Sequence, residues 1–453
     1  MKEIFEKRLV ENKIGSALRA TLFFPNRYYT GMSSLAYQGM YRLINSMPSW
    51  SVERYFSDTN SKYTIDNGRL VSDSDIIAIS ISYELDIKNI IDFLDRFSIP
   101  LEPLKRNRFQ PLIVIGGALT FINHKIVSII SDITFLGDSD VIFKEFLKDC
   151  SENGCERERI WDKYSKHVNI VTPIDNGLQK KERIEHEIYN PWYSSIIAKN
   201  TELSNMFLIE ISRGCKYDCP FCTVGSNFGK YRCFDRKIIQ KRIIESEVDK
   251  IGLVSANAAD YYELDELLEG LSENISISFS SLRLDTISDK LISSRFFKEQ
   301  NSITVGLESG SEKLRKIIGK NVDTDRLLRN ISIIGKNGKR ELRYYIIYGM
   351  PGETEQDLRE LIELLLESEK AWKYGNITLS LNPFVSVPGT KWQDLDFNMH
   401  LLKSKIKTIR KMVKESALKR TTLNFMSLKQ ARIQHKIINS NPNKIEDILE
   451  ILK

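Results

Sequence analysis

Residues 206–222 read MFLIEISRGCKYDCPFC, a short apolar strand that runs directly into three cysteines. Cys215, Cys219 and Cys222 are separated by three and then two residues. Three thiolates at this spacing can wrap one soft metal centre, and Cys thiolates hold iron–sulfur clusters. Three protein ligands leave one position open, and a catalytic metal needs such a position to bind its substrate. The stretch therefore predicts a catalytic iron–sulfur centre at the end of a strand.

A structural zinc site is the alternative for these cysteines, with Cys233 as a fourth ligand. Zinc sites more often use paired C-x₂-C units than a C-x₃-C-x₂-C triplet. The aromatic Phe221 directly before the last cysteine could also pack on a planar ligand beside a cluster. We therefore favour the cluster, and we expect Cys150, Cys155 and Cys233 to be ordinary thiols.

Strand and helix patterns alternate after the cysteines. Strands are expected at residues 206–212, 251–256, 275–281, 303–308, 342–349 and 377–385, and helices at 236–248, 264–271, 285–294, 311–318, 323–337 and 354–371. Thr354 with Asp357 gives a capping-box signal for the last of these helices. Parallel strands alternating with helices predict a partial TIM-like barrel, (βα)₆, with catalytic loops after the strands.

The chain before the cysteines shows a second alternation. Strands are expected at residues 21–25, 52–57, 75–83, 112–117 and 133–138, with helices at 33–47, 87–98, 124–131 and 141–149. Five such strands predict a flavodoxin-like, doubly wound α/β domain. The sequence thus predicts this domain at residues 1–150, a linker at 151–200, the barrel at 201–398 and a basic, mainly helical C-terminal extension at 399–453.

Composition limits the class of protein. Of the 453 residues, 42% are hydrophobic and 28% are charged, which excludes disordered, collagen-like and disulfide-scaffold chains. No apolar run reaches the roughly 18–20 residues of a membrane span, and the charged start lacks an apolar signal core. We expect a cytoplasmic protein without a membrane partner. Residues 401–453 carry 13 Lys and Arg against 4 Asp and Glu, so this tail either contacts RNA or forms a solvated helical face.

Several motifs resemble one known family. Residues 211–222, ISRGCKYDCPFC, resemble the radical S-adenosylmethionine (SAM) superfamily, whose signature is C-x₃-C-x-aromatic-C after the first barrel strand. GLESGSEKLRKIIGK (306–320), YYIIYGMPGETEQD (344–357) and LNPFVSVPGT (381–390) resemble its motifs at the fourth, fifth and sixth strands. NTELSNMFLIEISRGC (200–215), with the N-terminal domain, resembles the long form of the subgroup that has a cobalamin-binding domain before the barrel.

The resemblance implies that Cys215, Cys219 and Cys222 hold a 4Fe-4S cluster whose fourth iron chelates SAM. Reductive cleavage of SAM would give a radical that removes hydrogen from a substrate, with the electron coming from an external flavodoxin- or ferredoxin-like reductant. Implied SAM contacts, all near strand ends, are Phe221, Ser255, Asn257, Ser280, Arg283, Glu308, Ser309, Gly310, Gly349 and Pro351. Ser255 and Asn257 stand where many members have G-G-E. The sequence indicates no acid–base residue.

The resemblance also implies cobalamin in the N-terminal domain. Positions that match the lining of its nucleotide tail are Ser80, Ser82, Gly116, Gly117 and Thr120. Glycines at a strand end let a ligand approach the backbone, although an ordinary tight βα turn uses them too. The sequence lacks D-x-H-x-x-G, the motif whose His coordinates cobalt. A bound cobalamin would therefore have no His ligand. The alternative that the domain keeps the fold but has lost the cofactor stays open.

Three functions follow as hypotheses. The first is a cobalamin-dependent radical SAM enzyme, with methyl transfer to an unactivated carbon as its chemistry. The second is a cobalamin-independent radical SAM enzyme that modifies RNA or protein. The third is a non-catalytic zinc or iron–sulfur module that binds nucleic acid. The sequence does not identify the substrate in any of them.

Overall fold

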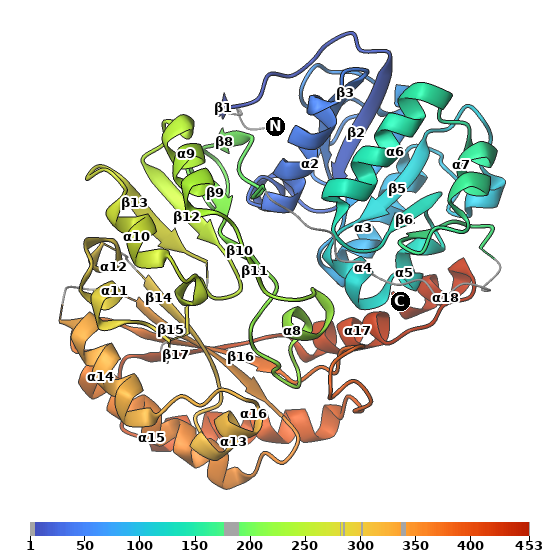
Figure 1. Ribbon diagram of the computed structural model, residues 1–453. Helices are drawn as coiled ribbons and strands as arrows, with labels where there is room; N and C mark the ends of the chain where they lie inside the picture. The colour runs from blue at the N-terminus through green and yellow to red at the C-terminus, as the bar shows by residue number, and fades with distance from the viewer. Residues whose placement is uncertain are drawn as a thin grey trace. The chain divides into compact units, whose positions relative to one another are not determined.

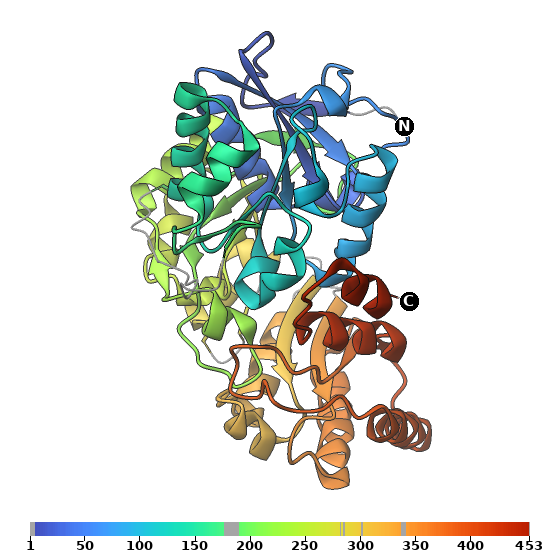
Figure 2. The same ribbon diagram turned by 90° about the vertical axis from the view of Figure 1, so that its right-hand side faces the viewer.

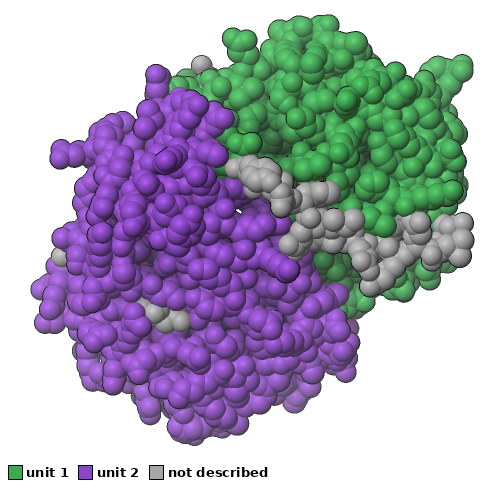
Figure 3. Space-filling model, in the orientation of Figure 1, with its two compact units in different colours: residues 1–209, 436–453 green, residues 210–435 purple. Residues whose placement is uncertain are grey.

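The computed structural model describes residues 5–175, 190–280, 282–283, 286–299, 302–336 and 341–452. The chain forms two compact units, which Figure 3 colours separately. The first unit comprises Met1–Ile209 with Lys436–Lys453, and the second comprises Glu210–His435. Among the helices of the described residues, none is both long and apolar enough to cross a bilayer.

A six-stranded sheet forms the centre of the first unit (Figure 1), in the order β3-β2-β4-β5-β6-β7. Its strands are β2 (Leu18–Phe24), β3 (Trp50–Phe56), β4 (Ile76–Ser80), β5 (Leu112–Gly116), β6 (Ile133–Phe135) and β7 (Ile170–Val171). The five strands β2 to β6 are parallel, while β7 pairs antiparallel with β6. This order confirms the flavodoxin-like fold. The short edge strand β7 falls in the stretch predicted as a linker.

Helices flank this sheet. They are α1 (Tyr28–Gly31), α2 (Leu35–Ser46), α3 (Ile87–Arg96), α4 (Ala118–Asn123), α5 (Lys125–Ser128), α6 (Ser139–Asn153) and α7 (Arg157–Tyr164), with 3-10 turns η1 (Val71–Asp73), η2 (Glu84–Asp86) and η3 (Pro103–Lys105). Buried apolar residues of α2 and α6 share one core cluster with the strands. The prediction of one helix at 124–131 is wrong, because that stretch holds only the short α5 and α4 precedes it. Helix α7 lies in the predicted linker.

The C-terminal residues belong to the first unit. The side-chain amide of Asn123 donates to the carbonyls of Ile438, at 3.0 Å, and Ser440, at 2.7 Å. Lys125 Nζ donates to Asn441 Oδ1 at 2.8 Å. Helix α18 (Ile445–Ile451) follows this contact. The same unit contains the antiparallel pair β1 (Glu6–Arg8) and β8 (Ile196–Ala198). The stretch predicted as one C-terminal extension is therefore divided between the two units.

Two further sheets are ordered β13-β12-β9 and β14-β15-β16-β17. All their strands lie in the second unit except β9, which begins in the first unit and ends at Glu210, where the second unit starts. The pairs β12–β13, β14–β15, β15–β16 and β16–β17 are parallel. The strands are β9 (Phe207–Glu210), β12 (Lys250–Val254), β13 (Ser276–Phe279), β14 (Ser302–Glu308), β15 (Glu341–Tyr348), β16 (Ile377–Pro383) and β17 (Thr421–Phe425). A parallel bridge between Leu282 and Val305 joins the two sheets. The six predicted strands are present, and β17 extends the row inside the stretch predicted as mainly helical.

The helices of the second unit are α8 (Thr223–Asn227), α9 (Arg236–Ser246), η4 (Ala258–Asp260), α10 (Leu264–Glu269), α11 (Asp289–Ser293), α12 (Arg295–Lys298), α13 (Glu312–Ile317), α14 (Thr324–Gly335), α15 (Glu355–Ala371) and α16 (Met399–Glu415). Helix α17 (Leu428–Ile438) begins in this unit and ends in the first. Figure 2 shows the same elements from a second side. The capping box is confirmed: Thr354 accepts from the Asp357 amide and Asp357 accepts from the Thr354 amide. It fixes the start of α15 soon after β15 ends.

Candidate functional site

The three cysteines lie in a loop that leaves the short strand β10 (Ser212–Arg213), which pairs with β11 (Arg232–Cys233). Gly214 opens the loop with φ +77°, and a Cβ there would lie 2.5 Å from the carbonyl of Lys230, so only glycine fits. Cys219 is buried, while Cys215 and Cys222 are half-buried. The amide of Cys222 donates to the Cys219 carbonyl at 3.0 Å, which closes the end of the loop.

The three thiols influence one another electrostatically. Burial raises the pKa of Cys215 and of Cys219, and the nearby Cys222 raises both further. The charges of Lys320 and Arg283 oppose this rise at Cys219, so two cations lie near the thiol group. Within the described ranges, no three His, Cys, Asp or Glu side chains gather as closely as a single metal ion requires. Nearby cations favour the thiolate form that an iron–sulfur cluster needs.

The segment after β16 supports the cysteine loop. The amide of Trp392 donates to the Pro220 carbonyl at 3.1 Å, and Lys391 forms a 2.5 Å ion pair with Asp218. The rings of Phe221 and Trp392 lie 6.4 Å apart. Both rings pack against a small buried cluster that consists of Leu314, Ile318, Met350 and Phe384. The predicted aromatic contact, Phe221, thus forms part of an apolar wall shared with the turn after β15.

Polar residues follow β12 and β13. Ser280 Oγ accepts from the Ser255 amide at 3.2 Å and donates to the Ser255 carbonyl at 3.0 Å, which joins the two strand ends. The Ser255 hydroxyl is buried and has no hydrogen-bond partner among the described residues. Asn257 donates to Thr286 at 3.0 Å and accepts from the Arg283 amide at 3.1 Å. Ser255 therefore has a hydroxyl free for a ligand, whereas Asn257 positions the next loop.

Arg283 lies against the cysteine loop. It is 8% exposed, and its guanidinium lies 3.8 Å from the centre of the Tyr217 ring. The Tyr217 hydroxyl donates to Asp260 at 3.0 Å, and Lys216 donates to the Asp260 carbonyl at 2.8 Å. This arrangement holds a buried positive charge beside the thiols, in the position where the sequence predicts a contact to the SAM carboxylate.

The end of β14 is irregular. Its pairing with β15 shifts register between Gly306 and Glu308, and Glu308 has φ +64°. A bulge re-aims a side chain, and a non-glycine residue at positive φ is strained. Lys320 Nζ donates to Glu308 Oε1 and to the Gly306 carbonyl, each at 2.7 Å. Lys320 was not predicted from the sequence, where a lysine after Gly319 has the appearance of an ordinary surface charge.

The polar groups directly after Glu308 form hydrogen bonds within the protein. Ser309 Oγ accepts from the Ser311 amide at 3.1 Å, and the buried Arg315 donates to the carbonyls of Ser309 and Gly310 at 3.2 and 2.6 Å. A Cβ on Gly310 would lie 2.2 Å from Leu361 Cα in α15. The helix contact therefore explains Gly310 in this structure. The predicted SAM contacts of Ser309 and Gly310 stay predictions.

The turn after β15 is held by a buried ion pair. Gly349 has φ +81°, and its amide donates to Glu353 Oε2 at 2.8 Å. Lys405 lies 2.7 Å from the same oxygen, while burial raises the pKa of Glu353. The hydroxyl of Tyr348, the last residue of β15, is buried without a hydrogen-bond partner among the described residues. Pro351 follows in this turn, half-buried.

These residues fit a 4Fe-4S cluster with SAM. Three free cysteines of one loop provide the cluster ligands, and two buried hydroxyls that have no hydrogen-bond partner among the described residues, on Ser255 and Tyr348, lie at strand ends. Carboxyl ends of parallel barrel strands are where such folds place catalysis. The predicted site residues after β12, β13, β14 and β15 all lie at this edge.

The crevice predicted for cobalamin is small. Ser80, Gly116 and Gly117 line a hollow of about 50 Å³ at the carboxyl ends of β4 and β5. Ser82 is exposed outside it, and the Thr120 hydroxyl donates to the Gly117 carbonyl at 2.9 Å. Sites that bury small ligands usually measure roughly 300–1,000 Å³. The crevice therefore does not fit the nucleotide tail, and Gly117, at φ +117°, serves a tight turn against Ile81.

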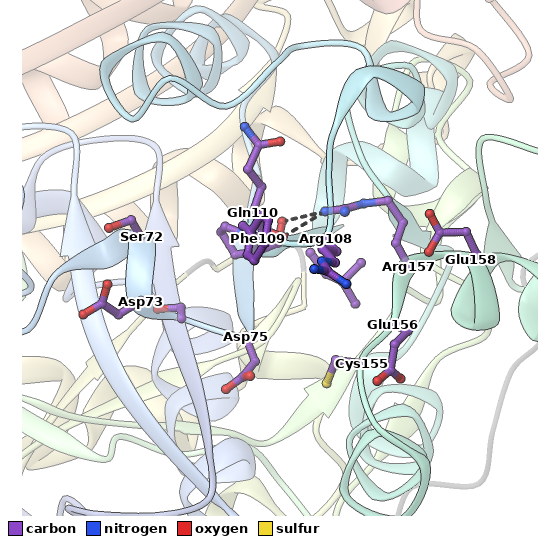
Figure 4. A pocket seen from close by; sticks show the side chains of 13 residues that line it. Ser72, Asp73, Asp75, Arg108, Phe109, Gln110, Cys155, Glu156, Arg157 and Glu158 are labelled. Atoms are coloured by element: carbon purple, nitrogen blue, oxygen red, sulfur yellow. Dashed lines mark hydrogen bonds between the residues drawn. The ribbon is translucent and has the colours of Figure 1, made fainter.

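A hollow of about 390 Å³ lies at the opposite, amino edge of the first sheet. Figure 4 shows Asp73, Asp75, Arg108 and Glu158 around it. The Arg157 guanidinium is used within the chain, since it donates to the carbonyls of Asn107, Gln110 and Pro111 and to Asp132. None of the predicted cobalamin positions lines this hollow.

Comparisons with known proteins agree with the site. Residues 36–173 match the family "Radical SAM proteins, N-terminal", and residues 209–365 match the "Radical SAM superfamily". The chain is 27% identical over 416 residues to an uncharacterised protein of Methanocaldococcus jannaschii, MJ0966, and the match covers 90% of this chain and 86% of that protein.

Two further similarities are partial. Ribosomal protein uS12 methylthiotransferase RimO of Clostridioides difficile is 28% identical over 182 residues, which span 36% of this chain and only 40% of RimO. The apo, SeMet-labelled cobalamin-dependent S-adenosylmethionine radical enzyme OxsB has a similar fold, with a TM-score of 0.53 at 13% identity over 88% of this chain and 62% of OxsB. The two family matches, together with the cysteine loop and the strands around it, show that the chain contains radical SAM superfamily domains at residues 36–173 and 209–365.

Proposed function

We propose that this chain cleaves SAM reductively at a 4Fe-4S cluster held by Cys215, Cys219 and Cys222, and that it acts on its substrate by hydrogen abstraction. The three thiolates would hold the cluster, which would supply the single electron that breaks the sulfonium C–S bond of SAM, with release of methionine and hydrogen abstraction from the substrate as the outcome. The observation that carries the proposal is the geometry of the loop that holds the three cysteines: Gly214 opens it, the hydrogen bond from the Cys222 amide to the Cys219 carbonyl closes it, and the buried Arg283 packs against its Tyr217 ring. An external flavodoxin- or ferredoxin-like protein is the proposed reductant.

The chain's own residues position SAM in this proposal. Phe221 provides an apolar wall for the adenine. Arg283 offers a buried cation for the carboxylate, and the Ser255 hydroxyl offers a hydrogen bond without breaking an existing one. Glu308, fixed by its 2.7 Å contact with Lys320, would accept a hydrogen bond from the nucleoside or from methionine.

A cysteine replacement tests the proposal. Cys219→Ala removes the most buried thiol of the three, and we expect loss of the cluster and of deoxyadenosine formation after anaerobic reconstitution with iron and sulfide. Iron content and chromatographic deoxyadenosine are the measurements. Cys233→Ala is the matched control, because Cys233 lies on β11 and donates at 3.2 Å to the hydroxyl of Tyr231, the residue directly before that strand. Deoxyadenosine formation by Cys219→Ala, or loss of the cluster in Cys233→Ala, contradicts the ligand assignment.

Cobalamin-dependent methyl transfer to an unactivated carbon is the second candidate. The fold shared with OxsB and the paired Gly116 and Gly117 at a strand end support it. The 50 Å³ crevice weighs against it. We therefore place the cobalamin-independent reaction first. Retention of hydroxocobalamin by the purified protein, read from its visible spectrum, would reverse this order.

A macromolecular substrate is part of the same proposal. The relatives named RimO are methylthiotransferases of a ribosomal protein, which supports a protein substrate. Helix α16 supports an anionic partner such as RNA, because it exposes several basic side chains, namely Lys403, Lys407, Arg410, Lys411 and Lys414. Salt-dependent RNA retention that weakens on replacing these residues tests the RNA partner.

A further inference from the structure

We propose that the chain fills its own ligand crevice: the indole of Trp192 takes the place of a nucleotide base in the first unit, which therefore works without cobalamin. Trp192 lies C-terminal to all strands of the sheet, yet it lines the hollow together with Ser80, Gly116 and Gly117. This inference goes beyond the proposed reaction and concerns the first unit alone. It is independent of the cluster in the second unit.

The crevice has the character of a site for an aromatic group. Its remaining lining is apolar and consists of Leu22, Ala36, Met40, Ala78, Ile79, Val114, Phe135 and Phe143. An indole and the benzimidazole base of a cobalamin tail are both flat, bicyclic and similar in size. With the indole present, only about 50 Å³ stays open. A second bicyclic ring cannot enter unless Trp192 leaves.

Helix α2 is adapted to this ring. Gly39 lies in the middle of α2, and a Cβ there would lie 2.3 Å from Cε3 of Trp192 and 2.5 Å from Cδ2. Glycine inside a helix costs about 1 kcal/mol relative to alanine. The close approach of the indole explains why a glycine nevertheless occupies this position. The contact joins a helix at residues 35–46 to a tryptophan that is distant in sequence.

The segment around Trp192 is fixed to the same helix. Arg42 donates to the Tyr193 carbonyl at 2.5 Å, and its guanidinium lies 3.7 Å from the centre of the Tyr193 ring. Gln38 accepts from the Ser195 amide at 2.8 Å, and its carbonyl accepts from the Ser195 hydroxyl at 2.7 Å. Gln38, Gly39 and Arg42 thus hold residues 192–195 along one side of α2. The Trp192 ring is therefore held in two ways, by its contact with α2 and by the hydrogen bonds that fix the backbone after it.

Removal of the ring gives the first test. Trp192→Ala should leave an apolar cavity that binds free indole, as engineered apolar cavities bind small aromatic molecules. We expect indole to raise the unfolding temperature of Trp192→Ala and to leave the wild type unchanged. Tyr63→Ala is the control, since it removes a 51% exposed aromatic ring of the same unit. Equal responses of all three proteins overturn the proposal.

A second variant covers the case in which Trp192→Ala does not fold. Gly39→Ala places a methyl group in the space of the ring, so it should displace the indole and expose it to solvent. Acrylamide quenching of tryptophan fluorescence should increase relative to the wild type, and the increase should vanish in Gly39→Ala/Trp192→Phe. Unchanged quenching in Gly39→Ala overturns the proposed fit.

The wild-type full chain provides the third measurement. After cluster reconstitution, it is incubated with hydroxocobalamin and desalted, and we expect no cobalamin in the protein fraction. Stoichiometric retention overturns the proposal. Iron content and deoxyadenosine formation are measured in the same samples, so a failure of the iron–sulfur chemistry is distinguished from a failure of this inference.

Discussion

The two units present the same type of edge, the carboxyl ends of parallel strands, and use it differently. In the second unit this edge carries three thiols, two cations and buried hydroxyls that have no hydrogen-bond partner among the described residues. In the first unit the hollow at the corresponding edge is lined mainly by apolar residues and by Trp192. The position at a strand end is therefore not enough to make a binding site. Polar groups that the fold leaves unsatisfied distinguish the two edges.

Glycine-to-alanine substitutions at the two edges should give the largest difference between the units. Gly310→Ala in the second unit should lower the free energy of unfolding by about 3 kcal/mol, as overpacking does, because its Cβ would lie 2.2 Å from Leu361 Cα. Gly116→Ala in the first unit meets only Phe135 Cβ at 3.9 Å and should be neutral or slightly stabilising. Denaturant unfolding measures both. Equal losses would show that the two edges are packed alike.

Lys320 provides the next largest effect. Lys320→Met removes the charge beside Cys219 and both hydrogen bonds at the end of β14, so Glu308 loses its fixed position. Partners that orient ligand-binding groups typically contribute about 10- to 100-fold in activity, and we expect a loss of this size in deoxyadenosine formation.

The control for this variant is Lys316→Met. Lys316 lies on α13 and forms an exposed 3.1 Å pair with Glu312, which should contribute little. Wild-type activity of the reconstituted Lys320→Met enzyme would show that Lys320 does not contribute to the site.

The smallest expected effect is a change in the pH dependence of stability, caused by Asp86 in the first unit. Burial raises the pKa of Asp86 to about 6, although a 2.8 Å hydrogen bond from Asn26 opposes the rise. A raised pKa in the folded state means that this carboxyl contributes stability below its ordinary pKa of about 4, which is lost as the pH rises through 6.

Asp86→Asn should therefore flatten the fall in unfolding temperature between pH 4 and 6. Asp357→Asn is the contrasting variant. Burial raises the pKa of Asp357, but hydrogen bonds from Ser311 and Thr354 outweigh it and lower the pKa, so its contribution is lost only as the pH falls further. Identical pH profiles of the wild type and Asp86→Asn would contradict the assignment.

Much of the fold could be predicted from the sequence because its signals are local. Apolar strands alternate with amphipathic helices in both units, and this pattern predicted the five parallel strands of the first sheet and the six strands β9, β12, β13, β14, β15 and β16. Strand β17 was missed because Thr421–Phe425 is short, half-exposed and located in a strongly basic stretch. Its pairing with β16 is tertiary, and no local pattern reveals it.

The site was predictable where one residue type carries the chemistry. The spacing of three cysteines is a local signal, whereas the role of Lys320 depends on the bulge that brings Glu308 within 2.7 Å. Trp192 could have been suspected from Gly39 inside a predicted helix. The partner of that glycine lies far along the chain, so only the structure identifies it.

The return of the C-terminal residues to Asn123 has a consequence for synthesis on the ribosome. The two contacts to Ile438 and Ser440 span 315 and 317 residues. At about 5–20 residues per second, a nascent chain would wait roughly 16 to 60 s between making the first partner and the second. The first unit to be translated is thus the last to be completed, and chaperones would encounter it with this surface still uncovered.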